Sequence, residues 1–564
     1  MRTRSVRPGI AAAAVAAGLA LSPAGPARAS DNVPGRPYEN RIVGFRFRPL
    51  NDWAAVPPGT DPDDPKICGY YSDKAKYDRT LKPECDVFAF KIAKSEGVAT
   101  EPTDLDGGDG GDEPPKPPTA EELRQMYLAQ GRLKSTREVV GRTRERYAEG
   151  AEELLGRLEE KKQKKLRAAL KAGEPVEKEI KTDDGVLTTI EVNIGIPLNT
   201  GDVMPGKIFA GFIRNDEYEV GVVYTIPGAN GWKDYAGGVQ SSVRTLEFLG
   251  GADVAAARKD LEDALVGKTG DERWLEEIKR KVGPGWDYLQ TRNYLLVYDK
   301  VVKPDRVRLV AVQIEAIRKD VYEVLFPPDR PITAISVVRV CKDKDQYTQY
   351  GGPGGSAGYW NPGEQELVFY EDTSAKKDSL RVLNHEAFHQ YIFYSVGSIS
   401  PHDWFNEGHG DYFSGHDYNG SGRFVPKPFS WRRDTIKGAM GSKTYVPLKT
   451  FVKYTHQQYY GPQIGQNYSQ GWSLIWFLRR TRNPEWKGIL ETYFQTLKGE
   501  VTKWMDEQVA AEKEKGTWKE GWKPPFTPNE VEEAARDKAL NAAYGGFDDR
   551  KWEKFEKEWK DFKY

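Results

Sequence analysis

The first half of the chain carries two groups of stretches with strand patterns, and in the first group apolar and polar residues alternate as in half-buried β-strands. Alternating runs at residues 41–47 and 86–92 predict one group, and runs at 186–194, 207–213 and 219–224 predict a second. A helix is expected to follow at about 234–249. Together the two groups predict a small α/β domain over residues 30–250.

Between these groups, residues 97–172 break the alternation. Residues 97–118 combine an acidic, Gly-rich run with a Pro-rich one, which is typical of a linker. Residues 119–172 are rich in Ala, Glu, Leu, Lys and Arg and open with a capping box at Thr119, so they predict a helical insertion. A solvated helix or helical hairpin with a thin apolar stripe is favoured over a partner-binding coiled coil, because no heptad is sustained.

Helical periodicity dominates the rest of the chain. A charged connecting helix is expected at 251–285. Residues 286–564 then predict strands at 294–298, 332–340 and 366–371, helices at 306–325 and 378–396, and a mostly helical part beyond 415. The predicted fold class is therefore α+β and multidomain, with a small α/β sheet subdomain followed by a helical subdomain.

The N-terminal residues have the composition of an export signal. Three arginines precede an apolar, Ala-rich run at 10–21, and Ala27-Arg28-Ala29 supplies a small-residue cleavage site before Ser30. This pattern predicts a secretory signal peptide over residues 1–29 and a secreted or periplasmic protein. No later stretch reaches about eighteen uninterrupted apolar residues, so no membrane span is expected.

Charge and cysteine content bear on nucleic-acid binding and on disulfide formation. The chain has 83 basic and 84 acidic residues, so its composition gives no reason to expect nucleic-acid binding. Three cysteines are present, and export permits disulfides. Cys68 and Cys85 are close in sequence and flanked by turn residues, so they are expected to form a disulfide, which leaves Cys341 as a buried free thiol.

The histidines carry the chemical signal. All six lie between residues 385 and 456, and the first two form the pattern His385-Glu386-Ala387-Phe388-His389. On a helix, positions four apart lie on one face, so both imidazoles can bind one metal ion with Glu386 beside them. The surrounding run is apolar over most of the helix, and a buried helix with these polar groups needs a partner for them. A pair of hydrogen-bonded core histidines is the alternative, and the downstream residues decide between the two.

A third ligand is expected on the next predicted helix. In metzincins a His follows six residues after the second one, but here that position is Ser395. Glu407 instead lies 18 positions after His389, which leaves room for a loop and an antiparallel second helix. Asp411 follows one helical turn later, on the same face as Glu407.

These segments resemble the gluzincin zinc metallopeptidases. The segment Trp404-Phe405-Asn406-Glu407-Gly408 is similar to the W-x-N-E-G segment of gluzincin aminopeptidases, and residues 290–480 resemble the peptidase MA-like domain of secreted bacterial proteins. The resemblance implies one Zn²⁺ per chain on His385, His389 and Glu407, with Glu386 as the general base that activates a water. By resemblance to thermolysin-like enzymes, Asp411 accepts a hydrogen bond from His385.

The resemblance also implies how a substrate is bound. Tyr468, in a later helix, is the expected donor to the oxyanion, with Tyr412 and His409 as the other candidates. Leu367, Val368 and Phe369 would lie in an edge strand that pairs with an extended peptide. The N-terminal part, over residues 36–96 and 176–250, resembles the PsbP-like α/β fold.

The predicted function is hydrolysis of a peptide or protein substrate by a secreted zinc metallopeptidase. Two alternatives stay open: a non-catalytic, zinc-stabilised binding or cell-envelope module, and a zinc hydrolase of a non-peptide amide. The intact Glu386 favours catalysis, because a purely structural site has no use for a base. The sequence leaves open the natural substrate, the choice between exo- and endopeptidase action, and the oligomeric state.

Overall fold

The computed structural model describes most of the chain after residue 32. Described are residues 33–60, 64–72, 82–92, 133–155, 174–182, 185–197, 203–266, 268, 270–353, 355–371, 378–418, 424–518 and 527–564. The predicted signal peptide at 1–29 and the predicted linker at 97–118 lie outside these residues. Of the predicted helical insertion, only residues 133–155 lie inside them.

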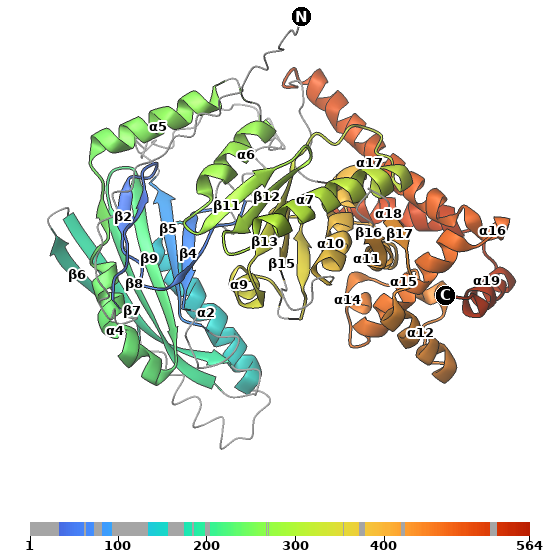
Figure 1. The fold of residues 1–564 in the computed structure, drawn as a ribbon, viewed down its shortest axis with the longest axis horizontal. Helices are drawn as coiled ribbons and strands as arrows, with labels where there is room; N and C mark the ends of the chain where they lie inside the picture. The colour runs from blue at the N-terminus through green and yellow to red at the C-terminus, as the bar shows by residue number, and fades with distance from the viewer. Residues whose placement is uncertain are drawn as a thin grey trace, which may run out of the picture.

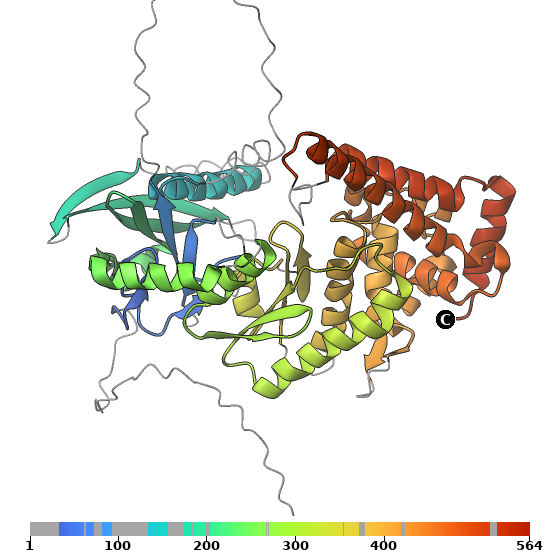
Figure 2. The ribbon, with the colours of Figure 1, turned by 90° about the horizontal axis from the view of Figure 1, so that it is seen from above.

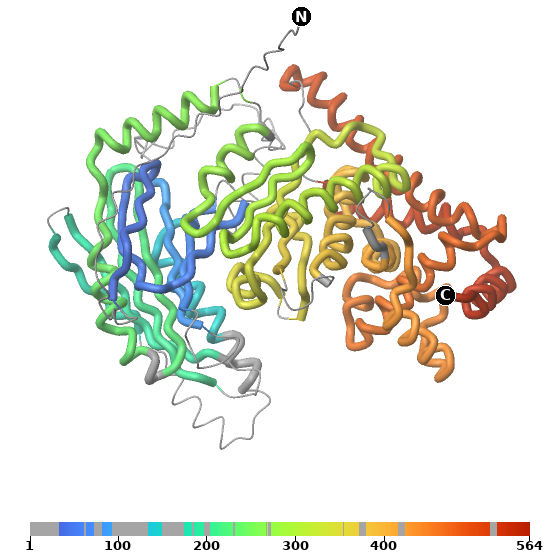
Figure 3. The backbone as a smooth tube through the Cα atoms, in the orientation of Figure 1, coloured from blue at the N-terminus to red at the C-terminus, as the bar shows by residue number. Residues whose placement is uncertain are grey.

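Two sheet-containing regions and a large helical region make up the described structure, which confirms a mixed α/β, multidomain fold (Figure 1). A seven-stranded sheet lies in the N-terminal region and a five-stranded sheet in the middle of the chain. The tube in Figure 3 follows the chain from these sheets, in blue to yellow, into the orange and red helices of the C-terminal region.

The larger sheet is antiparallel throughout, with the strand order β3-β4-β5-β9-β8-β7-β6. Its strands are β3 (Ala54–Val56), β4 (Lys66–Tyr71), β5 (Glu84–Lys91), β6 (Val176–Thr182), β7 (Gly185–Pro197), β8 (Val203–Arg214) and β9 (Tyr218–Pro227). β5 pairs with β9 along its whole length, so strands from both sides of residues 93–132 belong to one sheet.

A helix packs on each face of this sheet. Figure 2 shows α2 (Thr136–Leu155) lying along the sheet, and its Val139 and Val140 join a core with Phe88 and Phe90. α4 (Ala229–Val243) packs on the other face, where Val239 joins a second core. In the described part of the inserted segment, the apolar side chains of α2 are therefore buried against the sheet.

Shorter elements complete the N-terminal region. β1 (Tyr38–Asn40), β2 (Phe45–Phe47) and β10 (Glu247–Phe248) form a small antiparallel sheet, which adds Phe45 and Phe47 to the second core. The predicted connecting segment forms two helices, α5 (Gly251–Leu265) and α6 (Gly270–Lys281).

The expected disulfide between Cys68 and Cys85 is not formed. Both cysteines, like Cys341, are free and buried. Cys68 lies opposite Val87, whereas Cys85 lies opposite Tyr70, so the two thiols occupy diagonal positions on neighbouring strands. Diagonal positions are about 7–8 Å apart, which exceeds the Cα separation of about 4.4–6.8 Å that a disulfide spans. The disulfide prediction was wrong for this reason, and the predicted buried thiol of Cys341 is confirmed.

The second sheet has five strands in the order β11-β12-β13-β15-β14. They are β11 (Trp286–Gln290), β12 (Tyr294–Asp299), β13 (Ser336–Cys341), β14 (Gly358–Asn361) and β15 (Glu366–Tyr370). The three central strands run parallel, and the two outer strands run antiparallel to them. The connections contain α7 (Pro304–Ile317), a π-helical turn (Arg318–Tyr322), α8 (Glu323–Leu325) and α9 (Lys344–Gln349).

The edge strand of this sheet differs from the one that the sequence predicted. Leu367, Val368 and Phe369 lie in β15, which is enclosed between β13 and β14. Leu367 and Phe369 face the large core of the C-terminal half, and Val368 faces the core on the opposite side. The edge is formed by β14, whose four residues are too few to show a clear alternation in the sequence.

The C-terminal region is almost entirely helical, as predicted. Its helices are α10 (Asp378–Ser395), α11 (Asp403–Ser414), α12 (Ser430–Ser442), α13 (Leu448–Phe451), α14 (His456–Tyr459), α15 (Ile464–Arg480), α16 (Pro484–Lys487), α17 (Ile489–Glu514), α18 (Asn529–Tyr544) and α19 (Asp549–Asp561). Two short strands, β16 (His416–Tyr418) and β17 (Phe424–Pro426), pair between α11 and α12. Among the described helices, none is both long and apolar enough to cross a membrane.

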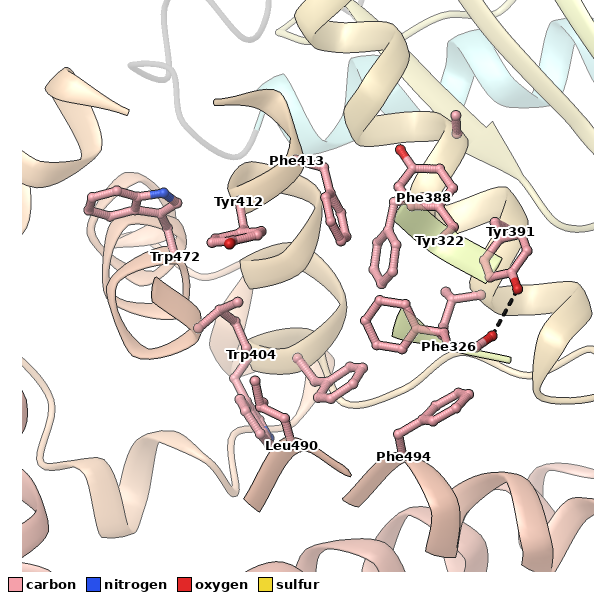
Figure 4. Close-up of a cluster of buried hydrophobic side chains, with 14 of the residues drawn as sticks. Tyr322, Phe326, Phe388, Tyr391, Trp404, Tyr412, Phe413, Trp472, Leu490 and Phe494 are labelled. Atoms are coloured by element: carbon pink, nitrogen blue, oxygen red, sulfur yellow. Dashed lines mark hydrogen bonds between the residues drawn. The ribbon is translucent and has the colours of Figure 1, made fainter. Parts of the chain in front are cut away.

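Aromatic side chains form the core where α10 meets α11 (Figure 4). The rings of Phe388 in α10 and Phe413 in α11 lie 5.1 Å apart, and Phe326, which follows α8, contacts both. The hydroxyl of Tyr391 donates to the backbone carbonyl of Phe326 at 2.8 Å. This packing positions the two helices that carry the predicted ligands.

Direct contacts join the N-terminal region to the second sheet. The indole of Trp286 donates to the carbonyl of Ala55, and the backbone N–H of Thr60 donates to the carboxylate of Glu364. Glu364 lies in the turn between β14 and β15. The N-terminal region therefore contacts the turn that leads out of the edge strand.

Glycine allows α11 to approach α15 closely. A Cβ at Gly408 would lie 2.7 Å from the carbonyl oxygen of Gly471 and 2.7 Å from Cγ1 of Ile475, both in α15. Glycine has a low helix propensity, and the approach of the two backbones explains why it stands in the middle of α11.

We expect Gly408→Ala to destabilise the protein, because the added methyl group has to displace the α15 backbone. Overpacking of this kind costs about 1–3 kcal/mol. Gly499→Ala is the matched control, since nothing lies within 4 Å of a Cβ at that position in the interior of α17. Replacing a glycine inside a helix by alanine stabilises it by roughly 0.5–1 kcal/mol. Urea unfolding measures both variants, and equal effects would contradict the close approach.

Candidate metal centre

Helix α10 presents His385 and His389 from a largely buried position. Two amide side chains hold this helix to its neighbours: Gln313 donates to Oδ1 of Asn384 at 2.8 Å, and Gln390 donates to a backbone carbonyl of β13 at 3.0 Å. These bonds fix the rotation of the helix about its axis. Because the two histidines are four positions apart, they then face the same side.

The turn after α10 returns the chain in the opposite direction. Gly397 has a φ of 91° and Ser398 a φ of 68°, and the N–H of Ser398 donates to the carbonyl of Phe393. Left-handed residues at a helix C-terminus end the helix and redirect the chain. Helix α11 then brings Glu407 against α10, as the spacing between His389 and Glu407 predicted.

His385, His389 and Glu407 converge on one point. Nε2 of His385 lies 3.0 Å from Oε2 of Glu407, and Nε2 of His389 lies 3.4 Å from the same oxygen. One ligand atom from each of the three residues lies within 4.8 Å of the others, and all three side chains are largely buried. Together they could hold one metal ion.

Each histidine is anchored through its other ring nitrogen. Nδ1 of His385 lies 3.4 Å from Oδ1 of Asp411, as the sequence predicted, and Nδ1 of His389 lies 2.9 Å from Oδ1 of Asn406. Both oxygens are acceptors, so they favour a proton on Nδ1 and turn Nε2 toward the shared point. A Cβ at Gly410 would lie 2.8 Å from the ring of His385, so this glycine makes the space that the ring occupies.

Sequence reasoning missed three residues of this site, and two of them lie far along the chain from their partners. Nε of Arg432 in α12 lies 2.6 Å from Oδ2 of Asp411, and the hydroxyl of Tyr460, directly after α14, donates to Oε1 of Glu407 at 2.7 Å. They stand 21 and 53 residues from their partners, so no local pattern connects them. Asn406 was also missed, although it stands next to Glu407 in the segment that identified the third ligand.

The electrostatics of the centre favour a cation. Burial alone would lower the pKa of His385, but its hydrogen bonds to Asp411 and Glu407 raise that pKa well above its usual value. Burial alone would raise the pKa of Glu407, but the charge of His389 and the hydrogen bond from His385 hold that pKa well below its usual value. The donor set therefore stabilises bound positive charge, as a metal site requires.

Glu386 lies between the ligand pair and the edge strand. Burial raises the pKa of its carboxyl group, although the charges of His385 and His389 and a hydrogen bond from the backbone of Trp360 oppose the rise. A Cβ at Gly358 in β14 would lie 3.1 Å from Cγ of Glu386. A carboxyl group with a raised pKa in this position suits proton transfer.

Of the three candidate oxyanion donors, Tyr468 is the one beside the ligands. Its ring lies 6.3 Å from the ring of His385 and nearly parallel to it. Tyr412 packs into the aromatic core of the helical region. His409 is fully buried and accepts a hydrogen bond from Arg479 at 2.9 Å, so it does not join the ligands.

The remaining described histidines lie outside the ligand group. At the start of α11, the hydroxyl of Tyr493 accepts the backbone N–H of His402 and lies 2.8 Å from its Nδ1, to which it therefore donates. Burial and the charge of Arg536 lower the pKa of His402 to about 4. The side chain of His456 is 78% exposed and lies next to Asp403. The side chain of His416 lies outside the described part of the structure.

Comparisons with known proteins do not assign the centre. No protein-family model matches the chain, and a search of curated proteins found no match. Among solved structures, the solution structure of cyanobacterial PsbP (CyanoP) from Synechocystis sp. PCC 6803 is similar over 38% of this chain and 91% of its own, with 10% identity and a TM-score of 0.21. A TM-score this low carries no argument, so the PsbP-like fold stays an expectation and the metal centre rests on its geometry.

The lowered pKa of His402 predicts a loss of stability in acid. Between pH 6.5 and about 4 the unfolded chain binds a proton at His402 and the folded protein does not, so the free energy of unfolding falls as the pH falls through this window. The contribution is up to about 1.4 kcal/mol per pH unit. In His402→Asn, the amide oxygen can accept the hydroxyl of Tyr493 in place of Nδ1, but the side chain binds no proton. The free energy of unfolding of this variant should therefore depend less steeply on pH. Urea unfolding at several pH values measures this dependence, and a parental slope in His402→Asn would contradict the prediction.

Proposed function

We propose that this protein is a secreted zinc metallopeptidase of the gluzincin type. The observation that carries the proposal is the convergence of His385, His389 and Glu407 from two antiparallel helices, with both histidines anchored through Nδ1. Two imidazoles and one carboxylate are a donor set of catalytic zinc, and they leave one coordination position for the reaction. The export signal predicted over residues 1–29 belongs to the same proposal and implies substrates outside the cytoplasm.

Glu386 is the general base of the proposed reaction. Zinc held by the three ligands would supply a water of lowered pKa and polarise the scissile carbonyl. Glu386 takes the proton of the attacking water and later passes it to the leaving amine. Its place beside His385 and His389, and its raised pKa, support this role.

Tyr468 is proposed as the donor to the oxyanion that forms at the scissile carbonyl. The support is its ring beside that of His385, on helix α15, which packs against α11. The hydroxyl of Tyr468 is bonded only weakly, to that of Tyr460 across 3.4 Å, so it is available to a substrate.

An extended peptide is proposed to lie along β14. This strand ends the sheet order, and among the described strands it pairs with β15 alone, so its outer side offers backbone groups for an added strand. Trp360 of β14 contacts Glu386 through its backbone N–H and Phe393 of α10 through its ring. A peptide on β14 would therefore pass next to the general base.

Glu386→Gln should abolish peptide cleavage without loss of zinc. Removal of a general base lowers turnover about 10²–10⁴-fold, and the amide keeps the shape of the carboxylate. Glu407→Gln, at a ligand, should lose zinc as well as activity. Cleavage of a proteome-derived peptide library and the zinc content of each purified protein measure the two effects.

The parent protein in the same experiment separates the alternatives. Bound zinc without cleavage of any peptide or amide would indicate the non-catalytic module. Turnover of glycan amides in place of peptides would indicate the non-peptide hydrolase.

Tyr468→Phe should lower kcat about 10²–10³-fold, as the loss of one oxyanion donor does. KM and zinc content should stay close to the parental values, because the hydroxyl acts on charge that develops only in the transition state. Steady-state kinetics on the best library peptide measures the change. Tyr412→Phe, at the candidate that lies in the core, should keep the parental kcat, and a parental kcat for Tyr468→Phe would exclude Tyr468 as the donor.

A further inference from the structure

The two carboxylate oxygens of Glu407 have different partners. Oε2 lies 3.0 Å from Nε2 of His385 and 3.4 Å from Nε2 of His389. Oε1 instead accepts a hydrogen bond from the hydroxyl of Tyr460 at 2.7 Å. The side chain of Glu407 is 6% exposed, so solvent has little access to replace this donor.

We propose that Tyr460 is a positioning residue that holds Glu407 as a one-oxygen metal ligand. The inference rests on the metal centre of the proposed function but does not require peptide hydrolysis. With Oε1 bonded to Tyr460, only Oε2 faces the two histidines, so Glu407 would offer a bound ion one oxygen and leave a coordination position open. Without the hydroxyl, Oε1 is either an unsatisfied buried acceptor or turns toward the ion.

The surrounding fold holds Tyr460 in place. A capping box at Thr455 begins α14, and Tyr460 directly follows that helix. The side-chain amide of Asn467 in α15 donates to two carbonyl oxygens of the last turn of α14, at 3.3 and 2.8 Å, which ties the two helices together. The ring of His456 lies 4.4 Å from the ring of Tyr460. These contacts fix the turn after α14 and so hold the hydroxyl of Tyr460 next to Glu407.

The hydroxyls of Tyr460 and Tyr468 have different roles in the site. The proton of Tyr460 is committed to Glu407, so its oxygen accepts the hydroxyl of Tyr468 across 3.4 Å. The contact between the two hydroxyls is long and correspondingly weak. Tyr468 can therefore turn from Tyr460 to a substrate, whereas Tyr460 cannot turn without releasing Glu407.

Zinc affinity of the full-length protein tests this role directly. Tyr460→Phe should raise the zinc Kd about 10–100-fold, the usual effect of removing a group that orients a metal ligand. Competition with a chromophoric chelator measures Kd without reference to activity. Tyr459→Phe is the matched control, because this neighbouring tyrosine is buried and its hydroxyl has no hydrogen-bond partner within the described structure. Its zinc Kd should equal that of the parent.

A parental Kd for Tyr460→Phe would overturn the proposal, and so would an equal rise in Tyr460→Phe and Tyr459→Phe. Tyr468→Phe should keep the parental zinc Kd, which separates its role from that of Tyr460. If the parent binds zinc tightly but cleaves no substrate, the proposed function fails and the role of Tyr460 stands on the Kd values. If the parent binds no zinc, both proposals fail.

Discussion

The packing of α10 against α11 decides where the ligand atoms lie, and it is set by side chains that do not reach the metal-binding point. Phe388 and Phe413 meet between the two helices, and Gly410 leaves space for the ring of His385. On the far side of α11, Gly408 allows α15 to approach within contact of the backbone. A metal site tolerates displacements of only about 0.5 Å. The aromatic core and the two glycines therefore determine whether the three donors converge.

The residues behind the ligands are chemically unlike one another. His385 faces a charged group, Asp411, which is itself paired with Arg432, whereas His389 faces the neutral amide of Asn406. Arg432 lies over the ring of Trp431 at 3.7 Å and over the ring of Tyr468 at 4.8 Å. One guanidinium thus offsets the charge of the carboxylate behind His385 and also packs against the proposed oxyanion donor. Arg432 therefore connects Asp411, which holds His385, with Tyr468, which is proposed to contact the substrate.

The N-terminal region has a core on each face of its larger sheet. Its contacts with the second sheet include the bond from Thr60 to Glu364, in the turn that joins β14 to β15. β14 also passes close to Glu386 through Gly358 and Trp360. The edge strand therefore has Glu386 on one side and the N-terminal region at its end.

Local patterns in the sequence determined much of the fold and the centre of the site. Alternation identified β2, where Arg46 is exposed between the buried Phe45 and Phe47, because a strand that is buried on one face shows its period whatever its neighbours are. Helical spacing placed His385 and His389 on one face, and chain length allowed Glu407 to return beside them. One helical turn placed Asp411 on the face of Glu407, and the resemblance to thermolysin-like enzymes implied its contact with His385.

Tertiary structure alone decided which strands and which distant residues became neighbours. Cys68 and Cys85 are close in sequence, but the register of β4 and β5 places them diagonally. Leu367, Val368 and Phe369 form a strand as predicted, yet β14 covers them and takes the edge. Arg432 in α12 contacts Asp411, and Tyr460 after α14 contacts Glu407. The local sequence around Arg432 and Tyr460 does not indicate either contact. Periodicity records which face of an element is buried, whereas register, sheet order and helix contacts arise from packing between elements that are far apart in the chain.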